Sequence, residues 1–118
     1  PLSLKSAILN YDKLDKKNSK KYLLLGDMLE LGKHSKNLHQ SITPIINRTK
    51  IDKIFVKGRN VISIFNKLSK SKKGKILENN SQIIELIKRD LNNNDYLMVK
   101  ASNATGFNKI IKNLRGSN

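Results

Sequence analysis

The sequence predicts an α/β fold in three layers, αβα, with a mostly parallel sheet between two layers of helices. Two observations lead to this prediction. Short continuous apolar runs, which are typical of strands buried on both faces, recur along the chain. Each run is followed by a stretch whose apolar residues repeat every three to four positions, as they do on one face of a helix. Strands that alternate with helices in this way form parallel sheets with right-handed crossovers.

The 118 residues are expected to form a single domain with its own core. Hydrophobic residues make up 37% of the chain and aromatic residues only 5%, so the core should consist mostly of Ile and Leu. Cysteine is absent, which excludes a disulfide framework and a thiolate metal site. No apolar run has the length of a membrane span or a signal-peptide core, and we therefore expect a cytoplasmic protein without membrane contact.

The first helix is expected from Ser3 to Asp15. The chain begins at Pro1, in the first turn of this helix, where a missing N–H is harmless. A start just inside a helix suggests a domain excised from a larger protein. The apolar face of this helix should consist of Leu4, Ala7, Ile8, Tyr11 and Leu14.

Four strand–helix units should follow, with strands at residues 22–25, 54–56, 76–77 and 96–99. The first of their helices starts near Ser35 and contains Pro44, which should kink or split it. The second spans residues 61–68. The third should begin at Ser81, a good N-cap residue. The last carries Phe107, Ile110, Ile111 and Leu114, and Gly116 should end it.

The net charge of +15 admits two interpretations. One is a basic module that binds nucleic acid. The other is a set of solvated lysines on an ordinary enzyme domain. The lysine runs at 16–21 and 70–75 precede strands, opposite the edge where such sheets bind ligands. The three phenylalanines occupy apolar-periodic positions, which leaves no aromatic platform for stacking bases. The sequence therefore favours solvated lysines, with a nucleic-acid module as the alternative.

Ligands of open parallel sheets bind at the carboxyl ends of the strands. Here those ends carry Gly26-Asp27, Lys57-Gly58-Arg59, Glu78-Asn79 and residues 100–103. The candidate binding residues at this edge are Asp27, Glu30, Lys100, Ser102 and Asn103. Lys100 precedes small residues that open a helix, and the first N–H groups of a helix favour an anion.

A purely structural role for the same residues remains open. Asp27 and Glu30 could simply accept hydrogen bonds from backbone N–H groups and fix the loop before Ser35. Likewise, Ser102 or Asn103 could be an ordinary N-cap.

No catalytic residue and no metal site are predicted. His34 and His39 are five residues apart, which is not the spacing of a zinc-binding helix, and no third ligand is evident. The chain has neither a phosphate-binding loop nor a glycine-rich dinucleotide fingerprint. We therefore expect the chain on its own to lack an apparatus for phosphoryl transfer.

Three segments resemble one enzyme family. The pattern Gly-Asp-Met-x-Glu-Leu-Gly-x-x-Ser-x-x-x-His from Gly26 to His39 is similar to the C-terminal domain of the MurF-type Mur ligases. Residues 1–8 resemble the helix after the family's Tyr-Asn-Ala-Asn-Pro signature, with Pro1 as its last residue. Residues 98–103 resemble its Val-Lys-Gly-Ser-Arg segment, although Ala101 replaces the glycine and Asn103 replaces the arginine.

The resemblance implies a Rossmann-like C-terminal domain of a three-domain ligase. These ligases use ATP and Mg²⁺, bound mainly by the central domain, to activate a substrate carboxylate as an acyl-phosphate. The amine of D-Ala-D-Ala then attacks the acyl-phosphate carbon and forms an amide with UDP-MurNAc-tripeptide, the substrate held by the N-terminal domain. The C-terminal domain closes over the nucleotide and helps to position the dipeptide. A sibling ligase resembling folylpolyglutamate synthetase is an alternative.

Overall fold

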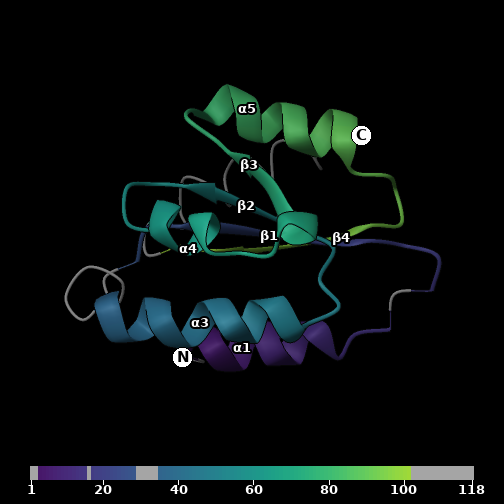
Figure 1. Cartoon of the computed structure of the whole chain (residues 1–118). Helices are drawn as coiled ribbons and strands as arrows, with labels where there is room; N and C mark the ends of the chain where they lie inside the picture. Colours follow the sequence, from purple (N-terminus) through teal and green to yellow (C-terminus); the bar gives the residue numbers. More distant parts are fainter. Residues whose placement is uncertain (1–2, 16, 29–34, 102–118) are drawn as a thin grey trace.

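The structure, a computed structural model, describes residues 3–15, 17–28 and 35–101. Its centre is a four-stranded parallel sheet with the strand order β3-β2-β1-β4 (Figure 1). The strands are β1 (Lys21–Gly26), β2 (Lys53–Lys57), β3 (Lys73–Ile76) and β4 (Tyr96–Lys100). The expected parallel sheet with helices on both faces is confirmed.

Helices cover both faces of the sheet (Figure 1). One face carries α1 (Leu4–Asp12), α3 (Ser35–Arg48) and α4 (Ile62–Asn66), whose buried side chains join those of the strands in one cluster. The other face carries α5 (Asn80–Glu85), which continues into a π-helical turn, η2 (Leu86–Asp90). A short 3-10 turn, η1 (Lys70–Lys72), leads into β3.

The core consists of two clusters separated by the sheet, because successive side chains of a strand point to opposite faces. In β1, Leu23 and Leu25 pack toward α1 and α3, whereas Tyr22 and Leu24 pack toward α5. All six residues of β1 are buried, as expected for a strand covered on both faces. The core is mainly aliphatic, in agreement with the composition.

Several boundaries differ from the sequence-based expectations. Helix α1 ends at Asp12 instead of Asp15, and Leu14, expected on its buried face, is 48% exposed. Helix α3 continues through Pro44 without a split. Pro44 has no N–H to donate to the Gln40 carbonyl. Both residues are exposed, so water can hydrate that carbonyl. Strand β3 begins three residues before the expected strand at 76–77 and shares only Ile76 with it. The expected final helix at 107–116 lies outside the described residues.

The N-cap of α5 is Asn79, and the expectation of Ser81 was wrong. The Asn79 side chain accepts a hydrogen bond from the Gln82 backbone N–H at 3.0 Å. The Gln82 side chain in turn accepts from the Glu78 backbone N–H. This reciprocal arrangement is similar to a capping box and satisfies two backbone donors at the start of the helix.

Candidate functional site

The carboxyl edge of the sheet brings together the ends of three strands. In the register of the sheet, Gly26 of β1 lies beside Lys57 of β2, and Leu25 lies beside Lys100 of β4. Helices that connect parallel strands run back across the sheet, so α3 and α5 begin at this edge. Two lysines and the positive ends of helix dipoles therefore lie at the same edge, which favours an anionic ligand.

Asp27 follows β1 directly and holds the loop that follows β2. One carboxylate oxygen, Oδ2, accepts from the Arg59 backbone N–H at 3.0 Å, and Oδ1 accepts from the Asn60 backbone N–H at 2.9 Å. The side chain is partly buried. This geometry fits the structural alternative, in which the carboxylate serves backbone donors, although the loop it fixes follows β2 and does not precede Ser35.

Gly58 allows the close approach of this loop to Asp27. Its φ of 135° lies in a region that side chains other than glycine rarely adopt. A Cβ atom at this position would lie 2.5 Å from Oδ1 of Asp27. The ends of β1 and β2 are thus joined by a contact that requires glycine at position 58 and the short carboxylate side chain of Asp27.

Lys100 ends β4 on the face of the sheet that α1 covers. Met98, two residues earlier, packs against the cluster formed with α1 and α3, and alternate residues of a strand share a face. The C-terminus of α1 lies at the amino edge, because Lys21 Nζ donates to the Asp12 carbonyl at 2.7 Å. The N-terminus of α1, capped by Ser3, therefore lies toward the carboxyl edge, on the face that carries Lys100.

The remaining candidates lie outside the described residues: Glu30, Ser102 and Asn103, together with His34. The side chain of His39, within α3, is likewise not described. Among residues 3–15, 17–28 and 35–101, no group of three or more His, Cys, Asp or Glu side chains could hold a metal ion.

The hydrogen-bond partners of Asp27 at this edge were missed from the sequence. The Arg59 and Asn60 backbone N–H groups are the partners of Asp27, more than 30 residues away in sequence. The isolated Gly58, two residues after the strand predicted at 54–56, was the available signal, since such glycines mark close backbone approach. Arg59 itself is exposed and adds a cation to the edge.

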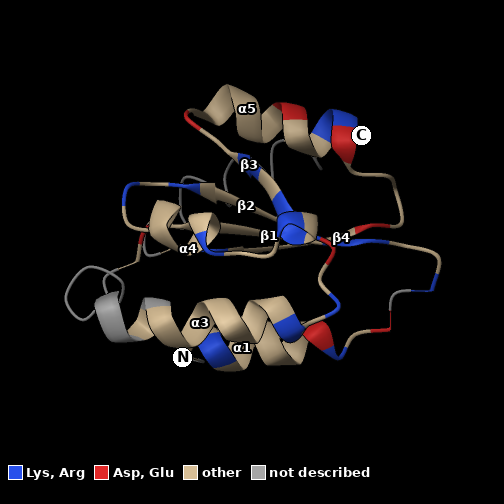
Figure 2. Cartoon of the chain, viewed as in Figure 1, with Lys and Arg blue, Asp and Glu red and all other residues tan. Residues whose placement is uncertain are grey.

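Lysines at the amino edge of the sheet have a structural function that the sequence did not indicate. Lys21, only 1% exposed, bonds the carbonyl at the end of α1. Lys72 Nζ donates to the Thr49 and Ile51 carbonyls, 2.6 and 2.7 Å away, just after α3. Cations at helix C-termini complement the helix dipole and satisfy free carbonyls. Figure 2 shows the other Lys and Arg residues spread over several elements.

Comparison with known proteins shows that the chain is similar to part of a ligase. No family model matches it. It is 29% identical over 117 residues to the UDP-N-acetylmuramoyl-tripeptide–D-alanyl-D-alanine ligase of Bacillus subtilis strain 168. The match covers 97% of this chain and 25% of the relative, so the chain spans about a quarter of that enzyme's length. In the part of the chain that the structure describes, no helix is long and apolar enough to cross a membrane. The resemblance to the MurF-type Mur ligases, which the motifs at Gly26–His39 and 98–103 indicated, is thereby confirmed over nearly the whole chain.

Proposed function

We propose that this chain is the C-terminal domain of an ATP-dependent amide ligase that adds D-Ala-D-Ala to UDP-MurNAc-tripeptide in peptidoglycan synthesis. The observation that carries the proposal is the match to such a ligase over 97% of the chain. The parallel sheet supports it, because its carboxyl edge offers cations and helix N-termini to an anionic ligand.

In the proposed enzyme this domain acts as a lid and positions the dipeptide. Closure over the nucleotide would exclude water from the acyl-phosphate, which would otherwise hydrolyse, and would bring the dipeptide amine to the acyl carbon. The amine forms the new C–N bond while the phosphate leaves with the bonding electrons, and the amine then loses a proton. The domain supplies binding and orientation and carries no catalytic residue.

Lys100 is the described residue that we assign to ligand binding. A lysine ammonium near a helix start suits a carboxylate or a phosphate oxygen, so it would hold the dipeptide carboxylate or the nucleotide. Asp27 holds the loop after β2 in place and so shapes the edge. Glu30, Ser102 and Asn103 complete the proposed set as groups that face the interdomain cleft.

ATP and Mg²⁺ would be bound mainly by the central domain of the same enzyme. The described residues of this chain contain no cluster of carboxylates that suits Mg²⁺. Their contribution would be the cationic edge that meets the nucleotide on closure. The partners are thus the N-terminal and central domains, the dipeptide and the UDP-linked tripeptide, in the cytoplasm.

Product analysis with the complete enzyme tests this proposal. The complete protein is incubated with ATP, Mg²⁺ and UDP-MurNAc-tripeptide, and the products are identified by mass spectrometry. We expect UDP-MurNAc-pentapeptide to form with D-Ala-D-Ala as the amine. Amide formation with glutamate and a folate instead would show a sibling ligase. Absence of both products, together with saturable nucleic-acid binding at physiological salt, would favour the basic binding module.

A further inference from the structure

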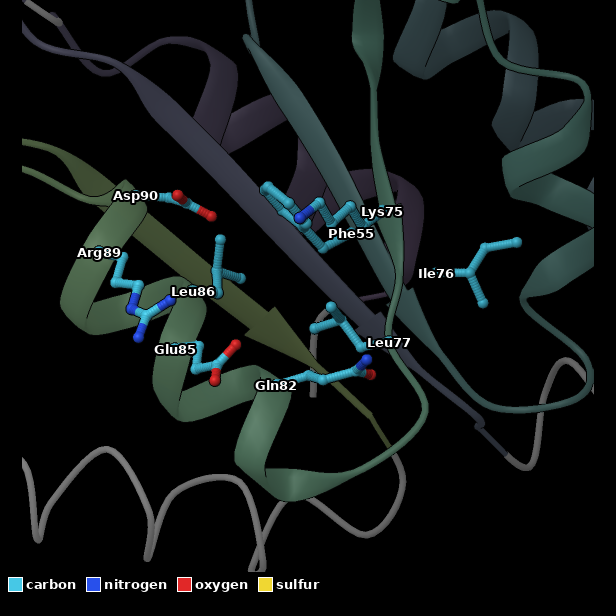
Figure 3. A pocket seen from close by; sticks show the side chains of 9 residues that line it. All are labelled: Phe55, Lys75, Ile76, Leu77, Gln82, Glu85, Leu86, Arg89 and Asp90. Atoms are coloured by element: carbon cyan, nitrogen blue, oxygen red, sulfur yellow. The ribbon is translucent and has the colours of Figure 1, made fainter.

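A groove on the face of the sheet that α5 covers has no function in the proposed ligase. It lies between the edge strand β3 and the helical segment formed by α5 and η2, and it encloses a cavity of about 210 Å³ (Figure 3). Its floor is apolar and consists of Phe55, Leu77 and Leu86, which are only 5%, 5% and 2% exposed. The cavity thus has an apolar floor, and its walls carry the polar side chains of Lys75, Gln82, Glu85, Arg89 and Asp90.

Strand β3 lies at one edge of the described sheet. It is the terminal strand in the order β3-β2-β1-β4, and no other strand of the described residues pairs with that side. The backbone N–H and C=O groups of such an edge are a template for an additional strand. A groove between an edge strand and a helix is the geometry in which many domains bind extended peptides by adding a strand to their sheet.

The two faces of β3 would select different side chains. Lys75, Ile76 and Leu77 all line the groove, and in Figure 3 the Ile76 side chain points away from the side chains of the other two. A shift in the β2–β3 register between Ile54 and Val56 places Lys73 on the face opposite Lys75. The Lys73 Nζ lies 5.8 Å from the centre of the Phe65 ring on that face. Because the side chains of an added strand alternate between the same two faces, one set would enter the apolar groove and the other would pass near Lys73.

Charge points to an acidic occupant. The segment Lys70–Ile76, which forms η1 and β3, contains four lysines and no acidic residue. Lysines on an edge strand disfavour pairing with a second copy of the same basic chain, and they favour a strand that carries carboxylates. The groove itself is lined by two acidic residues, Glu85 and Asp90, as well as Arg89, so the acidic residues of the occupant belong on the other face of the added strand. Arg89 and Asp90 lie in the π-helical turn, a rare conformation that occurs frequently at functional sites.

We propose that the edge of β3 and the adjoining groove bind an extended peptide segment of another protein, in which apolar residues alternate with acidic residues. The apolar residues enter the groove over Leu77 and Leu86. The acidic residues pair with Lys73 on the other face of the added strand, and the peptide backbone bonds the outer side of β3.

The test uses the 118-residue chain and a fluorescein-labelled synthetic peptide in which Val alternates with Glu. Fluorescence anisotropy gives the affinity, and amide NMR shifts of the ¹⁵N-labelled chain locate the site. We expect saturable binding with shifts concentrated in β3 and along α5–η2. A peptide of the same sequence with N-methylated backbone amides should bind at least about tenfold more weakly, because it cannot donate to the strand.

Matched charge variants separate this docking from general attraction to a basic chain. Lys73→Glu/Lys75→Glu should weaken binding at least about tenfold, whereas Lys5→Glu/Lys88→Glu, exposed and outside the groove, should change it by less than about threefold. Equal weakening by both double variants, equal affinity of the N-methylated peptide, or no saturation at about 1 mM peptide would overturn the proposal. Should the β3 variant fail to fold, the N-methylated peptide on the unaltered chain still decides.

Discussion

Replacement of Gly58 by alanine should disrupt the contact that joins the ends of β1 and β2. Two effects add at this position. A φ of 135° is strained for any residue with a Cβ atom, at a cost of about 1–3 kcal/mol. The new Cβ would also lie 2.5 Å from Oδ1 and 2.6 Å from Cγ of Asp27, so the carboxylate must move.

Movement of Asp27 weakens two hydrogen bonds to a charged acceptor, those from the Arg59 and Asn60 N–H groups. Such bonds contribute about 1.5–3 kcal/mol each when buried, and we discount this because Asp27 is only partly buried. The free energy of unfolding should therefore fall by about 2–4 kcal/mol for Gly58→Ala. In a domain of this size that lowers Tm by about 8–16 °C.

Urea denaturation followed by circular dichroism measures this loss, and a double-mutant cycle assigns its cause. In an Asp27→Ala background the carboxylate is absent, so Gly58→Ala should cost at least about 1 kcal/mol less than in the unaltered chain. A cost below about 0.5 kcal/mol, or the same cost in both backgrounds, would refute the reasoning that Gly58 is required by its contact with Asp27.

Three further predictions concern stability and activity. Tyr11→Phe should cost about 0.5–1.5 kcal/mol, since it removes the 2.8 Å hydrogen bond from the Tyr11 hydroxyl to the Tyr22 carbonyl. Burial raises the pKa of Tyr11 above its usual value. The stabilisation of the fold by the neutral Tyr11 side chain is therefore present below about pH 10 and is lost as the pH rises further, because the unfolded chain then loses the Tyr11 proton first. Chemical denaturation should show a smaller loss of stability at alkaline pH in the Phe variant. Asn79→Ala should cost about 0.5–2 kcal/mol in thermal unfolding and Ser81→Ala little, and a larger effect at Ser81 would contradict the assigned cap. The isolated chain should release no ADP from ATP with both ligase substrates present, and turnover of about 1 per second or more would disprove this.

Three of the strands were predictable because each contains a continuous apolar run. Strands β1, β2 and β4 were each placed within one residue of their observed bounds. Strand β3 was misplaced because its sequence, Lys-Gly-Lys-Ile, has no such run. Its position depends instead on the backbone ladder with β2 and on the close packing of Gly74 against Phe55, where a Cβ would lie 2.6 Å from the ring.

Local signals predicted the carboxyl edge but not its internal bonds. That Asp27 ends a buried strand follows from the apolar run before it, and its possible structural role was foreseen from the tendency of such carboxylates to bind backbone N–H groups. Its partners at Arg59 and Asn60 depend on the pairing of β1 with β2, which brings distant residues together. Leu14 was placed in the core by its helical spacing, yet α1 ends before it.

The kcat/KM of the complete ligase for D-Ala-D-Ala tests most directly whether the carboxyl edge binds the substrate. Lys100→Ala should lower it at least about tenfold, equivalent to about 1.4 kcal/mol, with Tm nearly unchanged. Lys88→Ala, an equal loss of charge at an exposed position in η2, should leave kcat/KM unaltered. Unaltered kinetics for Lys100→Ala, or a loss that follows unfolding, would contradict the assignment of this edge to the ligand.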